Sequence, residues 1–327
     1  MRKLFLFLTP ALLFVAILAM AVFQGNMARE RAFSADRVVY ARHLAPPDAL
    51  DQLYQKLGYR LPDIRKGAHA VPRIFFASLP DGLQDIPRAT DRKRAFIATM
   101  LPLILRVNEL VLEDRKRLLT LMEQRAKEAR LSTLNKRWLH RLARTYGLGS
   151  DFKIRDDSLK RLAKRVDIVP PSLALAQAAI ESGWGTSRFA QTGNALYGQW
   201  TWNDEDNGIV PTRRGSGKTH RIKAFDFLID SVRGYIRNIN RNRAYTHLRT
   251  IRQTLRANDQ PVTGRPLTPG LIQYSERREA YVQDLQSIIS GNRLEDFDAA
   301  RLAARSTIWG KTPKPPKPPK PFAQKKL

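Results

Sequence analysis

The chain has 327 residues, of which 43% are hydrophobic and 27% charged, and its formal net charge is +27. This balance is typical of a folded protein, and the length suffices for one large domain or two modest ones. The absence of cysteine excludes disulfide frameworks, thiol nucleophiles and thiolate-bound metals. With only five histidines, a centre built from several of them is not expected either, so we predict no metal and no cofactor.

The excess of positive charge favours a polyanionic partner: nucleic acid, anionic lipid or an acidic polymer of the cell envelope. Arg2 and Lys3 come directly before residues 4–23, a run of twenty residues without a charge. Such a run is long enough to span a bilayer, and the basic pair keeps its first end in the cytoplasm. We therefore expect an exported, inner-membrane-anchored protein that faces the periplasm or cell envelope and binds no nucleic acid.

Residues 1–23 are either a signal anchor or a cleaved signal peptide. Residues 19–21, Ala-Met-Ala, have the small-x-small pattern of a signal peptidase site. The apolar run is longer than the roughly 7 to 15 residues usual in a signal peptide, which favours an uncleaved anchor. Residues 24–91 then contain six prolines between short apolar stretches, and this pattern predicts a Pro-rich, loop-rich collar or linker.

Residues 92–150 form a predicted helical accessory region. Apolar residues recur at helical spacing along 96–129, which predicts one long helix that Pro102 kinks. Residues 135–146 and 158–166 have the same amphipathic pattern. Residues 172–182 are rich in alanine, with Ser172 as the expected N-cap and Gly183 as a stop signal.

The rest of the chain alternates between irregular and helical patterns. Residues 200–217 are rich in Trp, Gly and charged residues, which suits a loop or hairpin lobe, and helical periodicity returns at 225–238 and 270–289. Residues 295–327 end in a Pro/Lys repeat that predicts an extended, unstructured tail.

Glu181 is a candidate proton donor because of its place in the predicted Ala-rich helix. It falls in the last turn, where the partial negative charge of the helix end disfavours a second negative charge. Apolar neighbours such as Leu175, Ile180 and Trp184 would also desolvate the carboxyl. Both effects raise its pKa, as a general acid that works near neutral pH requires.

Two stretches resemble the signature of the bacterial glucosaminidases of glycoside hydrolase family 73: Ala-Gln-Ala-Ala-Ile-Glu-Ser-Gly-Trp-Gly at 176–185 and Gly-Asn-Ala-Leu-Tyr-Gly-Gln-Trp at 193–200. Within this group the chain resembles the exported Bax-type members, over residues 61–294. The resemblance implies a mainly α, lysozyme-like α+β glucosaminidase domain at 151–294, with a small β-lobe, that cuts the β-1,4 glycan of peptidoglycan on the reducing side of N-acetylglucosamine. It also implies that Glu181 is the general acid.

A second carboxylate is harder to assign. Family members often carry one in the β-lobe, but residues 212–220 contain no acid, and only Asp204, Glu205 and Asp206 remain in this lobe. We favour Glu205, although an acidic triplet is also typical of a solvated turn. The alternative is that the substrate's own 2-acetamido oxygen attacks the anomeric carbon, in which case Glu181 suffices.

Three tyrosines match family positions that line the glycan cleft: Tyr197, Tyr274 and Tyr281. Stacking on sugars and packing in the core are both compatible with their spacing, and we favour substrate binding. Asn194 can bind either substrate or backbone. Trp200 and Trp202 are either core residues or platforms for sugar rings.

The sequence thus predicts a peptidoglycan hydrolase, an endo-β-N-acetylglucosaminidase, whose partners are glycan strands, the membrane and anionic envelope polymers. Two other functions fit the same residues. A peptidoglycan-binding or scaffold protein with little or no catalysis needs the aromatic cleft but no proton donor. A lytic transglycosylase needs a single glutamate and is recognised by its 1,6-anhydro products.

Overall fold

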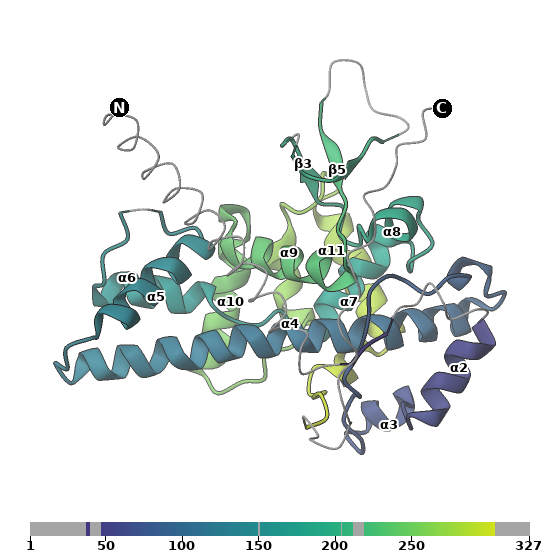
Figure 1. Ribbon diagram of the computed structural model, residues 1–327, viewed down its shortest axis with the longest axis horizontal. Coiled ribbons are helices and arrows are strands. Elements are labelled where there is room, and N and C mark those ends of the chain that lie inside the picture. The colour runs from purple at the N-terminus through teal and green to yellow at the C-terminus, as the bar shows by residue number, and fades with distance from the viewer. Residues whose placement is uncertain (1–36, 40–46, 150, 204, 212–218, 305–327) are drawn as a thin grey trace, which may run out of the picture. The chain divides into compact units, whose positions relative to one another are not determined.

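The structure is a computed structural model that describes residues 37–39, 47–149, 151–203, 205–211 and 219–304 (Figure 1). The predicted membrane segment at 4–23 and the Pro/Lys tail lie outside these residues. The chain divides into two units. One comprises residues 1–39 and 304–327, with strand β1 (Arg37–Val39), and the other comprises residues 40–303.

The larger unit is mainly helical. Its elements up to the centre of the chain are α2 (Pro47–Lys56), α3 (Leu61–Arg65), β2 (Ile74–Phe76), η2 (Leu83–Asp85), α4 (Ala89–Ala126), α5 (Thr133–Thr145) and α6 (Asp156–Arg165). The remaining elements are α7 (Pro171–Ser182), α8 (Arg188–Gly193), β3 (Trp200–Thr201), β4 (Gly208–Ile209), β5 (Arg221–Lys223), α9 (Leu228–Arg241), η3 (Arg243–Tyr245), α10 (Thr246–Ala257), η4 (Arg265–Leu271), α11 (Glu279–Gly291) and η5 (Leu294–Phe297).

Helix α4 is the long helix that the periodicity predicts, and it continues through Pro102 for 38 residues (Figure 1). Residues 95–108 are buried throughout, and α4 packs against β2, α6, α7 and α9. Its composition is apolar enough for a membrane span, yet 83% of that apolar stretch is buried inside the protein, as in a core helix. The helix therefore supports the smaller elements around it.

Residues 47–91 differ from the loop-rich linker that the prolines predict. Short helices begin at Pro47 and Leu61, and the apolar stretches between the prolines are buried: Leu50, Tyr54, Ile64, Phe75 and Phe76 are each at most 7% exposed. The Tyr54 hydroxyl lies 3.2 Å from Thr99 Oγ1 in α4. Proline interrupts secondary structure but does not prevent burial, so this segment adds a layer to the core. The domain boundaries drawn from the sequence stay predictions.

Helix α7 ends at Gly183 as the sequence predicts, but its N-cap differs from the prediction. Its N-cap is Pro170 and not Ser172, which lies inside the first turn. The Ser172 N–H and hydroxyl instead donate to the two carboxylate oxygens of Asp298, at 2.8 and 2.7 Å. Gly183 closes the other end in the left-handed conformation, at φ 58°, where glycine carries no steric penalty.

The β-lobe is a three-stranded antiparallel sheet of order β3-β5-β4, in which Trp200 and Ile209 both pair with Ile222. The strands β3 and β5 project from the helices in Figure 1. The expected mainly α fold with a small β-lobe is confirmed. Helices α9 and α11 overlap the predicted periodic stretches at 225–238 and 270–289, whereas the sequence patterns missed α10.

Asp298 replaces the expected N-cap of α7, and its removal should destabilise the fold. We expect Asp298→Ala to lower the free energy of unfolding by about 2 kcal/mol, since three donors lose a half-buried charged acceptor, the third being the Gly264 N–H. Urea denaturation at pH 7.5 measures this change. The control is Glu295→Ala, a half-exposed carboxylate in η5, the short helix that ends just before Asp298, for which we expect less than about 0.5 kcal/mol. Equal effects of the two substitutions would contradict the capping role.

Candidate active site

Glu181 lies in the last turn of α7, as the sequence predicts, and is half-buried. Its Oε1 accepts a hydrogen bond from the hydroxyl of Tyr281, at 3.0 Å. Tyr281 stands in α11, one hundred residues further along the chain. The carboxyl is therefore held at one oxygen by a partner that the fold brings in from a distance.

Tyr281 belongs to a buried chain of hydrogen bonds. Gln177 Nε2 donates to the Tyr281 hydroxyl at 3.0 Å, and the Tyr235 hydroxyl donates to Gln177 Oε1 at 2.6 Å. The Tyr281 oxygen accepts from Gln177 and has a single proton, which it therefore donates to Glu181. These hydrogen bonds therefore set the direction of the last one: Tyr281 donates and Glu181 accepts. The Tyr281 hydroxyl thus stabilises the charged carboxylate.

Stacked tyrosines surround this chain. The Tyr274 ring stacks on Tyr281 at 5.4 Å, and the Tyr197 ring stacks on Tyr235 at 3.9 Å, both nearly parallel. The Tyr274 hydroxyl donates to the Tyr197 backbone oxygen at 3.0 Å, which joins the two stacks. The three predicted tyrosines thus lie together beside Glu181. Tyr197 and Tyr281 are each 2% exposed, whereas Tyr274 is half-buried.

The second carboxyl oxygen of Glu181 faces the backbone that follows Tyr197. Gly198 has φ +59°, and a Cβ built on it would lie 3.3 Å from Glu181 Oε2. A side chain here would be strained and would press on the carboxyl. Glycine at this position keeps Oε2 accessible while Tyr281 holds Oε1.

The environment of Glu181 favours the protonated form. Burial raises the pKa of the carboxyl above its usual value, and the hydrogen bond from Tyr281 opposes part of that rise. The negative end of the α7 dipole acts in the same direction as burial. A carboxyl with a raised pKa, whose Oε2 has no hydrogen-bond partner among the described residues, is suited to donate a proton near neutral pH.

Asn194 and Glu205 lie in other surroundings. Asn194 ends α8 in the left-handed conformation, and its Nδ2 donates to the Phe225 backbone oxygen at 3.0 Å, so it binds the backbone. Glu205 is exposed in the loop between β3 and β4. Within the described part of the chain, no hydrogen bond or ion pair joins its carboxylate to Glu181. The neighbouring Asp206 is bound to Thr201 and Lys223.

The two tryptophans of the β-lobe are exposed. Trp200 and Trp202 are 53% and 65% exposed, so neither is a core residue. Trp200 stacks on His220 at 4.3 Å and meets Trp202 edge-on at 5.9 Å. The described residues contain no group of three or more His, Cys, Asp or Glu that could hold a metal ion.

Two members of the hydrogen-bond chain did not come from sequence reasoning. Gln177 precedes Glu181 by four residues, which places both on one face of α7, and this spacing was a usable signal. Tyr235 lies in α9 and reads as an ordinary core residue of an amphipathic helix. Only the packing of α9 against the site reveals its role.

Two comparisons with known proteins find similar sequences. Residues 156–294 match the family model described as mannosyl-glycoprotein endo-beta-N-acetylglucosaminidase, named Glucosaminidase. The chain is 32% identical to Protein bax of Escherichia coli (strain K12) over 217 residues, which are 66% of this chain and 75% of that protein. No solved structure matches the chain. The matched region holds α7, the β-lobe and α11, so the mainly helical arrangement is a lysozyme-like α+β fold.

Titration of Glu181 tests whether Tyr281 donates the hydrogen bond between them. In Tyr281→Phe the carboxylate loses its donor while burial remains, so the pKa of Glu181 should rise further. Carbon-13 NMR of glutamate-labelled protein, with Glu181→Gln to assign the signal, measures this pKa. In the control Tyr274→Phe the Tyr281 hydroxyl is kept, and we expect a smaller change. A fall in the Glu181 pKa in Tyr281→Phe would contradict the assignment of Tyr281 as donor and Glu181 as acceptor.

Proposed function

Since this chain belongs to the family of Bax-type glucosaminidase-domain proteins, we propose that it is a peptidoglycan hydrolase, an endo-β-N-acetylglucosaminidase with Glu181 as its general acid. The glucosaminidase domain marks a glycoside hydrolase in general, and its substrate is a glycan. The observation that carries the finer proposal is the state of Glu181: a half-buried carboxyl with a raised pKa, bound at Oε1 and open at Oε2.

The geometry suggests how the proton moves. Oε1 accepts from Tyr281, so the transferable proton sits on Oε2, beside Gly198. Oε2 donates this proton to the glycosidic oxygen as the bond to the anomeric carbon breaks. The carboxylate that forms is stabilised by the Tyr281 hydroxyl, whose orientation Gln177 and Tyr235 already fix. Little reorganisation accompanies the transfer, which is how preorganised donors lower a barrier.

The second half of the reaction has two candidate nucleophiles. In the first, Glu205 approaches when substrate orders its loop. A carboxyl separation of about 5 to 5.5 Å would then give retention, and about 6.5 to 9.5 Å inversion. In the second, the 2-acetamido oxygen of the substrate attacks the anomeric carbon. The exposure of Glu205 and the absence of any described bond to Glu181 favour the substrate-assisted route.

The surroundings of the site suit a long, anionic glycan. Trp200 and Trp202 offer exposed rings for sugar stacking, and Tyr274 is accessible beside Glu181. The net charge of +27 would retain the enzyme on peptidoglycan, whose stem peptides carry carboxylates, and on other anionic envelope polymers. Residues 4–23 would anchor the protein in the inner membrane, with the catalytic unit in the periplasm or cell envelope.

Digestion of purified peptidoglycan tests the proposed reaction. We expect the full chain in detergent to release fragments that end in N-acetylglucosamine, as seen by mass spectrometry after borohydride reduction. Glu181→Gln should be slower by at least about 100-fold, because general acid catalysis typically contributes that much. Glu279→Gln, at an exposed glutamate in α11, is the matched control and should retain activity.

The products also separate the alternatives. Anhydromuramic ends would make the protein a lytic transglycosylase. If wild type and variants bind peptidoglycan equally and none cleaves it, the protein is a binding or scaffold protein.

Glu205→Gln distinguishes the two routes for the second step. In the substrate-assisted route the rate should change less than about threefold, since the carboxylate does no chemistry. A loss of about 100-fold or more, with peptidoglycan binding unchanged, would instead assign Glu205 as nucleophile or base. Product analysis under single-turnover conditions measures both.

A further inference from the structure

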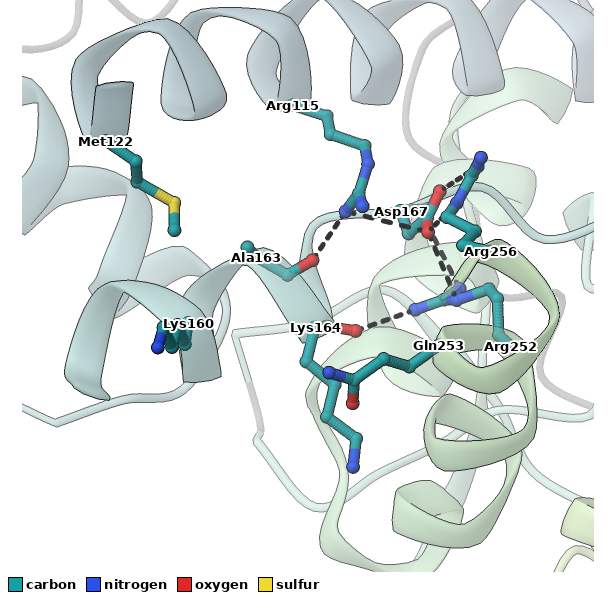
Figure 2. A pocket seen from close by; sticks show the side chains of 9 residues that line it. All are labelled: Arg115, Met122, Lys160, Ala163, Lys164, Asp167, Arg252, Gln253 and Arg256. Carbon is teal, nitrogen blue, oxygen red and sulfur yellow. Dashed lines mark hydrogen bonds and ion pairs between the residues drawn. The ribbon is translucent and has the colours of Figure 1, made fainter. Parts of the chain in front are cut away.

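A small cavity with an unusual charge lies between α4, α6 and α10. Its volume is about 140 Å³ (Figure 2). The residues that line it are Arg115, Met122, Lys160, Ala163, Lys164, Asp167, Arg252, Gln253 and Arg256. Five of these side chains are cationic and one is an acid, which makes the formal charge of the lining +4. Nothing in the proposed glycan chemistry uses these residues.

Asp167 is shared among three guanidinium groups. Its buried carboxylate accepts two hydrogen bonds of 2.6 Å from Arg256, and Arg115 and Arg252 lie at 3.6 and 3.7 Å. Figure 2 shows the three guanidinium groups converging on this carboxylate. One negative charge cannot neutralise three positive charges, so the cluster keeps an excess of cation.

The backbone at the end of α6 holds the arginines in place without removing that excess. Arg115 donates to the Ala163 and Val166 oxygens, and Arg252 donates to the Lys164 and Ile168 oxygens. These bonds fix the side chains, but carbonyl groups carry only partial charge. Burial and the neighbouring cations lower the pKa of Arg252 to about 10, against the pull of Asp167. The side chains of the cavity are therefore held in place, and part of their positive charge has no counter-charge among the described residues.

Several donors of the cluster have no acceptor among the described residues. Arg115 uses only Nη1 in its hydrogen bonds, and Arg256 uses Nε and Nη2, which leaves Nε and Nη2 of Arg115 and Nη1 of Arg256. Lys160 is exposed at the rim and has no ion pair within the described part of the chain. Guanidinium forks and an ammonium are the donors that proteins use for phosphate.

We propose that this cavity binds a phosphate group. A dianion matches the excess of charge better than a carboxylate does. The volume admits one tetrahedral oxyanion but is smaller than the roughly 300 to 1,000 Å³ of pockets for whole organic ligands. The rest of the ligand, if there is one, leaves through the rim at Lys160 and Gln253.

The site is separate from Glu181. Asp167 precedes α7 and Glu181 lies in its last turn, and a helix of twelve residues is about 18 Å long. The proposal therefore stands independently of glycan cleavage. An anionic ligand would then bind near the first end of α7, whereas the candidate proton donor lies near the last.

Gln253 gives a substitution pair that spares the arginine cluster. Its exposed side chain lines the cavity and makes no hydrogen bond with another described residue, so neither Gln253→Glu nor Gln253→Ala breaks a contact. Isothermal titration of the full chain in detergent with inorganic phosphate, at pH 7.5, measures the affinity. We expect saturable binding that Gln253→Ala changes less than about twofold. Gln253→Glu should weaken it at least about tenfold, because a carboxylate in the cavity repels the anion.

Three results would overturn the proposal: no saturable binding of phosphate, equal affinity in Gln253→Glu and wild type, or acetate binding as tightly as phosphate. Two further titrants identify the source of the phosphate group. Tighter binding of a glycerol phosphate polymer than of inorganic phosphate assigns a phosphate-bearing polymer, and tighter binding of glycerol 3-phosphate assigns a small phosphomonoester. Thermal unfolding shows that the fold is intact: we expect Gln253→Ala to match wild type and Gln253→Glu to unfold at the same or a higher temperature, because its carboxylate offsets part of the excess positive charge.

Discussion

The burial of α7 is the constraint on which the rest of the structure depends. Ten of its twelve residues are buried, so each end must be satisfied by groups from other parts of the chain. At the first end the donors of Ser172 meet Asp298. At the last end Glu181 meets Tyr281, and Gln177 inside the helix orients that tyrosine. The same packing that stabilises the helix thus desolvates and orients its one carboxyl.

Burial has opposite consequences at the two ends of this helix, because the charges are opposite. Around Glu181 it disfavours a negative charge and raises the pKa, as the proposed role of proton donor requires. Around Arg252 it disfavours a positive charge and lowers the pKa, while the guanidinium stays ionised near pH 7. The carboxyl can relieve its cost by protonation, whereas the arginine cluster needs a counter-anion. This difference separates a site for proton transfer from a site for ion binding.

The sequence predicted features that depend on local pattern. The Ala-rich helix with Glu181 in its last turn, the long helix through Pro102 and the small β-lobe are confirmed, as is the family. Features that depend on long-range contact were missed. Asp298 caps α7 in place of the local cap expected at Ser172. The linker predicted at 24–91 differs from the structure at 47–91, where apolar residues between the prolines are buried. Likewise, no sequence pattern predicts the hydrogen bond between Tyr235 and Gln177. The assignments of Glu205 and of the tyrosines to substrate stay predictions.

The distance along the chain between Glu181 and Tyr281 also orders events in time. The two residues are one hundred positions apart, and α9, α10 and η4 lie between them. A ribosome delivers the chain from its N-terminus, so α7 is complete well before α11 exists. Until then the Glu181 carboxyl lacks the Tyr281 hydroxyl that orients it. Of the two tyrosine stacks, Tyr274–Tyr281 cannot form before α11 is present. A nascent chain, or one truncated before α11, therefore holds Glu181 in an unassembled state, and the site can assemble only once α11 has been made.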